Sequence, residues 1–337
     1  MPRLRRIDCT APGIRRVRHG RGFRYLDKDS PVVDREVLER IRELAIPPAW
    51  EDVWICPHPR GHIQATGQDA AGRKQYLYHP RWREHRDRQK FKEMEEFARA
   101  LPAVRKRVEA DLGRRGLVRE RVLACAVRLL DLGFFRIGSE RYAAENETFG
   151  LATLRQRHLG LERGVAVFDY PAKGAKRHRQ EIADPLVLPT LRALKRRDGG
   201  GSELLAYRRG REWVDVRSEE INDYLREQTG ADFTAKDFRT WNATVLAAVE
   251  LAARADDAKS SKTARKRAMV EATERVAEYL SNTPAVCRSA YIDPRVFDRF
   301  DSGETIRSPL ERIVGIADPG DFPDRERIER AVLRLLA

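Results

Sequence analysis

The hydrophobic pattern of this chain is mainly that of strands up to about residue 88 and mainly that of helices after it, and this change limits the folds that the chain can adopt. Before that point apolar and polar residues alternate in "GFRYLD", which predicts a strand. "DVWICP" and "HIQATGQDAAGRKQYLYHP" also predict strands, and the last stretch is expected to fold back as a hairpin at Ala71-Gly72. "DREVLERIRELA" has helical spacing instead, with Asp34 as its N-cap. We therefore expect residues 1–88 to form a small β-rich domain.

From residue 89 to the end the apolar residues recur mainly with helical spacing. "RERVLACAVRLLDLGFF", "TAKDFRTWNATVLAAVELAAR" and "KTARKRAMVEATERVAEYL" predict long helices, and the charged stretch "RWREHRDRQKFKEMEE" is expected to be a linker that runs into a helix. One interruption, "GVAVFDYPAKGAKRHRQEIAD", predicts a β-hairpin with a glycine-containing turn. The expected fold class is α+β: the small β domain is followed by a larger, mainly helical domain over residues 89–337.

The charge of the chain points to a polyanionic partner. It has 66 Lys and Arg against 52 Asp and Glu, a net charge of +14, and 54 of the 66 basic residues are arginine. The planar guanidinium fork suits phosphate, so this excess favours nucleic acid. Half of the net charge falls in the first 88 residues, which predicts a DNA-binding role for that domain. The alternative is an arginine-rich chain from a GC-rich genome that binds no nucleic acid.

Several classes of protein lack support in the sequence. No run approaches the roughly 18 apolar residues of a membrane span, and the opening residues lack the apolar stretch of a secretory signal. The four cysteines (Cys9, Cys56, Cys125 and Cys287) are scattered and form no CxxC pair, which favours buried thiols. The phosphate loop GxxxxGK[ST], the HExxH motif and a tight acidic cluster are all missing. We expect a cytoplasmic, nucleoid-associated protein without a cofactor or a required metal.

Five polar residues stand out as candidates for chemistry. Arg136 lies among apolar residues in "FFRIGSERY", Lys173 occupies the predicted hairpin tip, and Arg239 follows Phe238 in "KDFRTW". Asn282 precedes a Thr-Pro helix start, and Tyr291 comes about two turns later. Each also has an ordinary explanation. An arginine can cap carbonyls or join an ion pair, a tip lysine can be merely solvated, and a tyrosine can pack in the core.

A second set of residues is a candidate for contacts with DNA. Lys74, Tyr76 and Tyr78 alternate along one predicted strand, so their side chains share a face of the sheet. A cation beside two phenols can meet phosphates and sugars, although two half-buried tyrosines with a solvated lysine fit the pattern equally well. The further expected DNA contacts are Arg73, Arg141 and Lys176.

Together, and in this order, these segments resemble the type IB DNA topoisomerases, in particular the compact poxvirus-like branch found in bacteria. "FRIGSERY", "AKGAKRH", "KDFRTW" and "NTPAVCRSAYIDP" are similar to the family's catalytic motifs. Upstream, "IPPAWEDVWICPHPRGHIQATGQDAAGRKQYLYHP" resembles its N-terminal β domain, so the resemblance spans about residues 20–300. Poxviral and eukaryotic relatives generally have histidine where this chain has Asn282, whereas bacterial members carry Asn.

The resemblance implies a mechanism for these residues. Tyr291 would attack a DNA phosphodiester to give a 3′-phosphotyrosyl link, so that the duplex can swivel and lose supercoils before the strand is rejoined. Arg136 and Arg239 would clamp the phosphate, Asn282 would donate a neutral hydrogen bond, and Lys173 would protonate the leaving 5′-oxygen. Nearby guanidiniums favour a phenolate, so a tyrosine can be activated without a histidine base. A single chain is expected to form a clamp around duplex DNA, without ATP or metal.

Two rival functions stay open at this point. A tyrosine recombinase uses similar chemistry, but it typically has a His-x-x-Arg element where this chain has Lys236 and Arg239 with no histidine near them. A non-catalytic DNA-binding architectural protein fits the composition, but it gives no reason for the ordered set of cationic residues.

Overall fold

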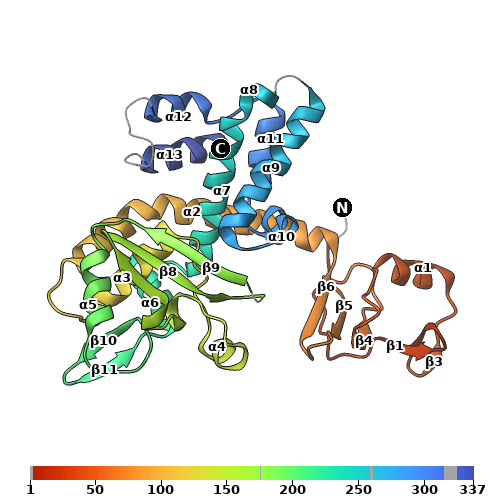
Figure 1. Cartoon of the computed structure of the whole chain (residues 1–337). Helices are drawn as coiled ribbons and strands as arrows, with labels where there is room; N and C mark the ends of the chain where they lie inside the picture. The colour runs from red at the N-terminus through yellow and green to blue at the C-terminus, as the bar shows by residue number, and fades with distance from the viewer. Residues whose placement is uncertain (1–2, 175, 259–260, 315–324) are drawn as a thin grey trace. The chain divides into compact units, whose positions relative to one another are not determined.

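A computed structural model describes residues 3–174, 176–258, 261–314 and 325–337. The chain divides into two compact units, Met1–Lys92 and Glu93–Ala337, and the division falls inside the long helix α2, Pro80–Leu112 (Figure 1). The charged stretch that we expected to begin as a linker is therefore helical from its start. Its Arg, Lys and Glu residues are good helix formers, and Arg99 pairs with Glu95 one turn away, at 2.8 Å.

The first unit is built on a six-stranded antiparallel sheet with the strand order β3-β2-β1-β4-β5-β6. Helix α1 begins where the sequence predicts, because the Asp34 carboxylate accepts a hydrogen bond from the Val37 amide at 3.1 Å. The buried side chains of Ile41 on this helix and Ile55 on the sheet belong to one core. The elements are β1 (Ile14–His19), β2 (Gly22–Asp27), β3 (Ser30–Pro31), α1 (Arg35–Glu43), β4 (Glu51–Ile55), β5 (Ile63–Gln68) and β6 (Lys74–Tyr78).

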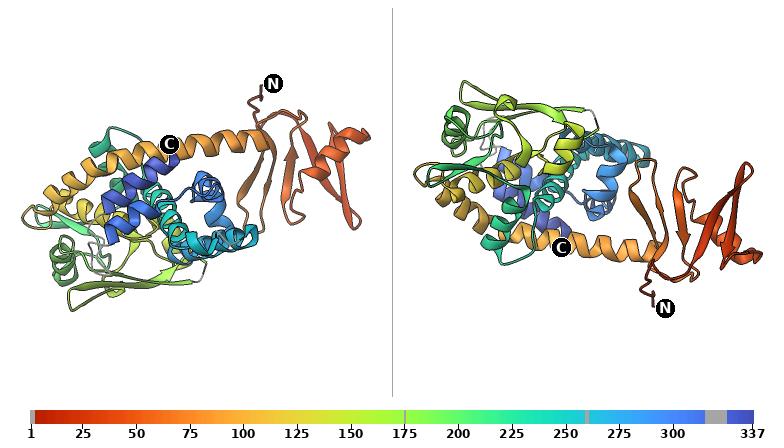
Figure 2. Two further views of the ribbon diagram at one scale, coloured as in Figure 1. Left: turned by 90° about the horizontal axis from the view of Figure 1, so that it is seen from above. Right: turned by 90° about the horizontal axis from the view of Figure 1, so that it is seen from below.

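The second unit is mainly helical, as expected. Its helices are α3 (Arg119–Leu132), α4 (Glu140–Asn146), α5 (Leu188–Arg196), α6 (Ser218–Thr229), α7 (Ala235–Ala253), α8 (Ala255–Ala258), α9 (Lys262–Leu280), α10 (Pro284–Ala290), α11 (Pro294–Asp301), α12 (Arg307–Val314) and α13 (Arg325–Leu336), with short 3₁₀ turns at Leu151–Thr153 and Gln156–His158. Helix α7 is buried over much of its length, and α3, α9, α11 and α13 all contact it (Figures 1 and 2). Among the described residues, no helix combines the length and apolar character needed to cross a membrane.

The β structure of this unit is larger than the single hairpin that the sequence predicts. Strands β8 (Val165–Ala172) and β9 (Lys176–Ile182) form that hairpin, but β7 (Leu159–Glu162) pairs with β8 to make a three-stranded sheet. A separate hairpin joins β10 (Ala206–Arg209) to β11 (Glu212–Asp215). These added strands are only four residues long, which is too short for an alternating pattern to emerge.

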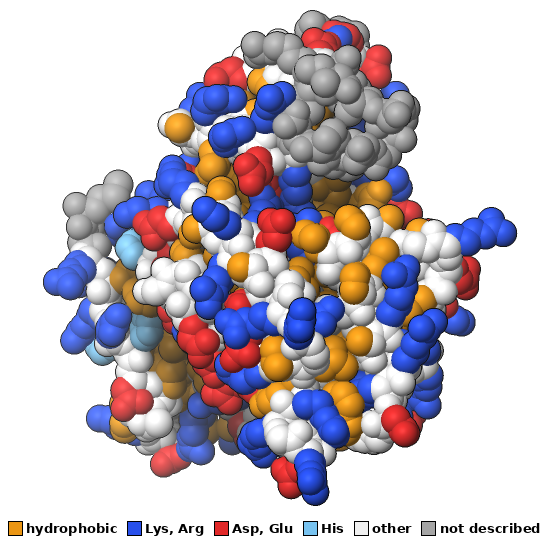
Figure 3. Space-filling view, turned by 90° about the vertical axis from the view of Figure 1, so that its left-hand side faces the viewer, with side chains coloured by type: hydrophobic (Ala, Val, Ile, Leu, Met, Phe, Trp, Pro, Cys, Tyr) orange, Lys and Arg blue, Asp and Glu red, His pale blue; other side chains and the backbone are white. Residues whose placement is uncertain are grey.

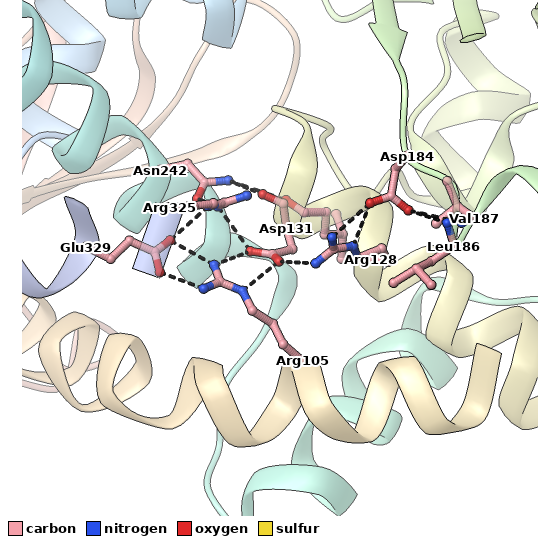
Figure 4. A network of polar contacts seen from close by, with 10 residues as sticks. Arg105, Arg128, Asp131, Asp184, Leu186, Val187, Asn242, Arg325 and Glu329 are labelled. Atoms are coloured by element: carbon pink, nitrogen blue, oxygen red, sulfur yellow. Dashed lines mark hydrogen bonds and ion pairs between the residues drawn. The ribbon is translucent and has the colours of Figure 1, made fainter. Parts of the chain in front are cut away.

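A buried network of charges joins four helices of the second unit (Figure 4). Asp131 at the end of α3 pairs with Arg105 of α2 at 2.9 Å and with Arg325 of α13 at 3.1 Å. Glu329 of α13 pairs with the same two arginines, and Arg325 also donates to the Asn242 side-chain oxygen on α7 at 2.8 Å. The last helix of the chain is thus tied to the two helices that lead into the candidate site.

The surface charge does not by itself locate a functional site. On the face in Figure 3, Lys and Arg side chains are spread widely, with Asp and Glu among them. Exposed arginines commonly have an acidic neighbour, such as Glu181 at 2.7 Å from Arg179 and Glu278 at 2.7 Å from Arg275. A guanidinium without such a partner is therefore more informative than the total charge.

Candidate active site

Arg136 lies in the loop that follows α3, and backbone hydrogen bonds fix this loop. Helix α3 ends at Leu132 with Gly133 as its C-cap, and the Arg136 carbonyl accepts from the Leu151 amide at 2.8 Å. Gly138 has φ +86°, and a Cβ there would lie 2.9 Å from the Gly150 Cα. The two backbones can approach this closely only because both residues are glycine. The "RIGS" segment therefore holds Arg136 at a defined position.

The Arg136 side chain reaches across to the end of helix α9. It is half-buried, and its Nη2 donates to the Ser281 carbonyl at 3.0 Å and to the Asn282 side-chain oxygen. Capping a distant carbonyl is one of the ordinary explanations that the sequence left open. However, the partner segment here is the one that contains another candidate residue, Asn282.

Arg239 lies on α7 and is almost fully buried, with 4% of its surface exposed. Its guanidinium donates to the carbonyl of Phe134, two residues before Arg136, and to the carbonyl of Leu280 at 3.1 Å, two residues before Asn282. The ion pair expected from the local sequence is not formed with any described carboxylate. Instead the side chain joins the α3 loop to the end of α9.

The two arginines form a concentrated positive charge. Burial lowers the pKa of Arg239, and the charge of Arg136 lowers it further, whereas the phenol of Tyr291 acts in the opposite direction. Neither arginine forms an ion pair with a carboxylate of the described residues. Because a buried charge without a counterion is costly, the arrangement indicates a site for an anion.

Asn282 follows the end of α9, and its side chain lies beside Arg136. Its backbone amide donates to the Ala277 carbonyl at 3.0 Å, which closes the helix end. Its side-chain oxygen accepts from Arg136, while its Nδ2 is buried without a hydrogen-bond partner in the described part of the chain. The Arg239 Nε is also buried without a hydrogen-bond partner among the described residues. Two buried donors without partners thus belong to the candidate site.

Tyr291 ends helix α10 beside Arg239. The helix starts as predicted, with Thr283 as N-cap and Pro284 in its first turn, and the Arg239 Cζ lies 5.3 Å from the centroid of the Tyr291 ring. The Thr244 hydroxyl on α7 lies 3.3 Å from the Tyr291 carbonyl and 3.1 Å from the Asp293 amide. Helix α7 therefore positions both the arginine and the backbone of the tyrosine.

Two other tyrosines lie near the arginines, and their surroundings differ. Tyr170 is 3% exposed, and its burial raises its pKa, which makes it a poor nucleophile. Tyr279 is 42% exposed, its ring packs on Phe134 with centroids 5.4 Å apart, and its hydroxyl accepts from Arg275. Tyr291 is half-buried, which leaves its ring in contact with the buried guanidinium and partly open to a large substrate.

Lys173 and Lys176 lie at and beside the tip of the β8–β9 hairpin. Both are exposed, and no hydrogen bond or ion pair among the described residues joins Lys173 to the arginines or to Tyr291. Burial raises the pKa of the Cys287 thiol, whereas the charges of Arg239, Arg136 and Lys176 and the polar side chain of Asn282 lower it. Cys287 is one helical turn before Tyr291 on α10.

The candidate DNA contacts of the first unit lie together, as the alternation predicts. Lys74, Tyr76 and Tyr78 are exposed on one face of β6. The two tyrosine rings stack with centroids 6.1 Å apart, and the Lys74 Nζ lies 5.7 Å from the Tyr76 ring. Arg73 pairs with Asp69 in the preceding turn at 2.7 Å. In the second unit Arg141 is exposed and pairs with Glu145 at 2.9 Å.

Sequence reasoning missed several residues that support the site. Thr244 and Asn242 are the polar positions of the otherwise apolar stretch "WNATVLAAV" of α7, which is the signal that could have identified them. His178 and Ser281 had no such signal, since each lies in a polar stretch; the structure brings the His178 ring and the Ser281 hydroxyl to 2.9 Å. Within the described part of the chain, no cluster of His, Cys, Asp and Glu could hold a metal ion.

Comparison with known proteins identifies the family of the chain. The family model described as the catalytic core of eukaryotic DNA topoisomerase I matches residues 79–305, and the model of the N-terminal domain of bacterial DNA topoisomerase IB matches residues 22–69. DNA topoisomerase 1B of Acanthamoeba polyphaga mimivirus is 30% identical over 289 residues, which cover 83% of this chain and 85% of that protein.

More distant relatives match a shorter region. DNA topoisomerase 1 of Candidozyma auris is 30% identical over 44% of this chain, and DNA topoisomerase 1 of Daucus carota is 27% identical over 38%. The matched regions are only 20% and 15% of those two proteins. The match to the catalytic-core model extends over well more than half of the chain and includes all five candidate catalytic positions. The chain therefore belongs to the type IB DNA topoisomerase family.

Proposed function

We propose that this chain relaxes supercoiled duplex DNA by reversible transesterification, with Tyr291 as the nucleophile and Arg136, Arg239, Asn282 and Lys173 as the assisting groups. Family membership makes the chain a DNA topoisomerase, and hence an isomerase; the proposal concerns the roles of its residues. The observation that carries it is a pair of neighbouring arginines, without a carboxylate partner among the described residues, beside a half-buried tyrosine. A phosphodiester is an anion of the class that such a site attracts.

In the cleavage step the Tyr291 hydroxyl oxygen bonds to phosphorus, and the bond from phosphorus to the 5′-oxygen breaks. The products are a 3′-phosphotyrosyl link and a free 5′-hydroxyl. Tyr291 releases its proton to water, and Lys173 gives a proton to the leaving 5′-oxygen and regains one from water, so protons balance over the step. The reverse step releases Tyr291 and rejoins the strand. Because a phosphodiester bond is exchanged rather than hydrolysed, the cycle has no need for ATP.

The arginines act on the transition state. Negative charge gathers there on the two non-bridging phosphate oxygens, and positively charged donors held in place oppose it. Arg239 is held by two backbone carbonyls and Arg136 by the α9 end, so little reorganisation accompanies the reaction. Asn282 adds one neutral donor. Since it brings no charge, most of the stabilisation falls to the two guanidiniums.

The first unit has a supporting role in this proposal. Its exposed Lys74, Tyr76 and Tyr78 would contact phosphates and sugars of the duplex, and the two units would close around the DNA as a clamp. One chain carries all the proposed catalytic residues, so we expect a monomer to be active. Sedimentation of the enzyme on a short duplex measures this directly: a 1:1 complex supports it, and a requirement for two chains contradicts it.

The experiment that tests the proposal is relaxation of supercoiled plasmid in EDTA without ATP. The wild-type enzyme should relax the plasmid, and Tyr291→Phe should lose relaxation while it binds DNA normally. Tyr279→Phe is the matched control, because this exposed tyrosine also lies beside the site and should be dispensable. Relaxation by Tyr291→Phe would reject the nucleophile, and a strict need for Mg²⁺ would reject the metal-free scheme.

A further inference from the structure

The turn at the end of α9 holds the polar side of the candidate site together. Arg239 donates to the Leu280 carbonyl at 3.1 Å, and Arg136 donates to the Ser281 carbonyl at 3.0 Å and to the Asn282 side chain. Three successive residues of this turn thus receive hydrogen bonds from the two proposed catalytic arginines. A small shift of the turn would move Asn282 and both guanidiniums together.

Ser281 adopts a backbone conformation that glycine normally takes. It ends α9 with φ +51° and ψ +44°, in the left-handed region, and its amide donates to the Ala277 and Glu278 carbonyls. Glycine is the usual residue at this position of a helix end, because other L-residues are strained there. The serine side chain is therefore present at some cost in stability, as is common for residues that serve a functional site.

The Ser281 hydroxyl meets the buried ring of His178. The His178 Nδ1 lies 2.9 Å from the Ser281 Oγ, and its Nε2 lies 3.2 Å from the Gln180 side-chain oxygen. That oxygen also accepts from the Phe134 amide at 3.4 Å. Because an amide oxygen can only accept, Nε2 carries the proton, and Nδ1 of a neutral ring accepts from Ser281.

The surroundings of His178 favour the neutral ring. Burial lowers its pKa, the hydrogen bond to Gln180 acts in the opposite direction, and the charges of Arg136 and Arg239 lower it further. The ring also packs edge-on against Tyr170, with centroids 5.3 Å apart. A neutral histidine in this position is a fixed acceptor rather than an additional charge in the site.

We propose that His178 and Ser281 form a positioning pair, which holds the α9 turn so that Asn282 and Arg136 face the phosphate. The pair also connects this turn to strand β9 of the hairpin that carries Lys173. His178 acts through its neighbours and does not touch the reacting atoms. This inference rests on the proposed function, since it concerns the same phosphate site.

Three substitutions separate positioning from stability. Ser281→Gly removes the hydroxyl and relieves the left-handed strain, so we expect an unchanged or higher Tm together with cleavage slowed about 10-fold, the effect of one lost hydrogen bond. His178→Phe keeps an aromatic ring in the pocket and should slow cleavage equally. His178→Asn retains an acceptor near the Nδ1 position and should stay within about twofold of wild type.

The measurement is single-turnover formation of the covalent adduct with a radiolabelled duplex, together with the Kd for DNA and the Tm of each variant. The double variant Ser281→Gly, His178→Phe should be no slower than either single variant, because both remove the same contact. Slowing of about 100-fold in the double variant, weaker DNA binding that accounts for the loss, or wild-type cleavage by Ser281→Gly would each overturn the inference.

The same assay distinguishes a failure of this inference from a failure of the proposed function. Adduct formation by Tyr291→Phe would remove the proposed function, and the positioning pair with it. If Tyr291→Phe forms no adduct while Ser281→Gly cleaves at the wild-type rate, the function stands and only the positioning pair is rejected.

Discussion

Replacing Asp131 by Asn tests how the charge network supports the catalytic unit. Asp131 is 2% exposed and pairs with Arg105 at 2.9 Å, Arg325 at 3.1 Å and Arg128 at 3.4 Å. Burial raises the pKa of this carboxyl, but the three arginines outweigh burial and bring it to about 2, from an ordinary value of 3.8. A shift of that size corresponds to roughly 2.5 kcal/mol of stability.

The loss of unfolding free energy expected from the substitution itself is similar to the value obtained from the pKa shift. Removing one partner of a buried ion pair commonly costs about 3–5 kcal/mol, but Asn keeps the packing and one acceptor, so we expect about 2–3 kcal/mol. For a unit of this size that lowers the Tm by on the order of 5–10 °C. Thermal unfolding followed by circular dichroism at pH 7 measures it. Glu212→Gln on β11 is the control, because its carboxylate is 77% exposed and only 4.0 Å from Arg209; its Tm should not change.

The direction of this pKa shift determines how the Tm difference between wild type and Asp131→Asn changes with pH. The folded pKa of Asp131 lies below its ordinary value, so its contribution to stability is complete above about pH 4 and is lost as the pH falls toward 2. The difference in Tm between wild type and Asp131→Asn should therefore narrow between pH 7 and pH 3. Equal Tm values at pH 7, or a difference that widens in acid, would refute the reasoning.

Further predictions concern the site and the first unit. Arg239→Lys should slow cleavage by about 10²–10³, because the compact ammonium lacks the planar fork with which the guanidinium bonds two carbonyls beside Tyr291; single-turnover cleavage near the wild-type rate contradicts this. Lys173→Ala should slow cleavage of ordinary DNA by about 10²–10⁴, but much less on a duplex with sulfur in place of the leaving 5′-oxygen, since a thiolate needs no proton; equal losses on both substrates would remove Lys173 as the acid. Lys74→Ala should reduce the salt slope of DNA binding by roughly one, and an unchanged slope would exclude its phosphate contact.

Long periodic elements were predictable from the sequence. The pattern of "KTARKRAMVEATERVAEYL" gives α9 with its observed limits, Lys262–Leu280, and Asp34 caps α1 as expected. The four-residue strands and the helical start of α2 were not predictable, because neither shows a distinct period over so few residues.

The candidate site was predictable in its members but not in its contacts. The motifs identified Arg136, Arg239, Asn282 and Tyr291, and the structure brings these four together. Their order along the chain could not reveal that both arginines donate to the α9 turn, since those hydrogen bonds join residues more than 40 positions apart.

The supporting residues depend on the fold itself. His178 and Ser281 are 103 positions apart in sequence and meet only because β9 packs beside the end of α9. Nothing in "KRHRQE" or "YLSNTP" distinguishes these two residues from exposed polar ones. The position of Lys173, in contrast, was predictable from the sequence, because the hairpin was predicted correctly and the lysine lies exposed at its tip.

The central claim is that Tyr291 becomes covalently joined to DNA, and the most direct measurement is to map the adduct. Wild-type enzyme is incubated with a radiolabelled duplex in EDTA, denatured with SDS and digested, and the peptide that carries the label is sequenced by mass spectrometry. We predict a phosphotyrosyl bond at Tyr291, present in Tyr279→Phe and absent in Tyr291→Phe. A label on Tyr279, Tyr170 or any other residue, or an adduct that persists in Tyr291→Phe, would contradict the account.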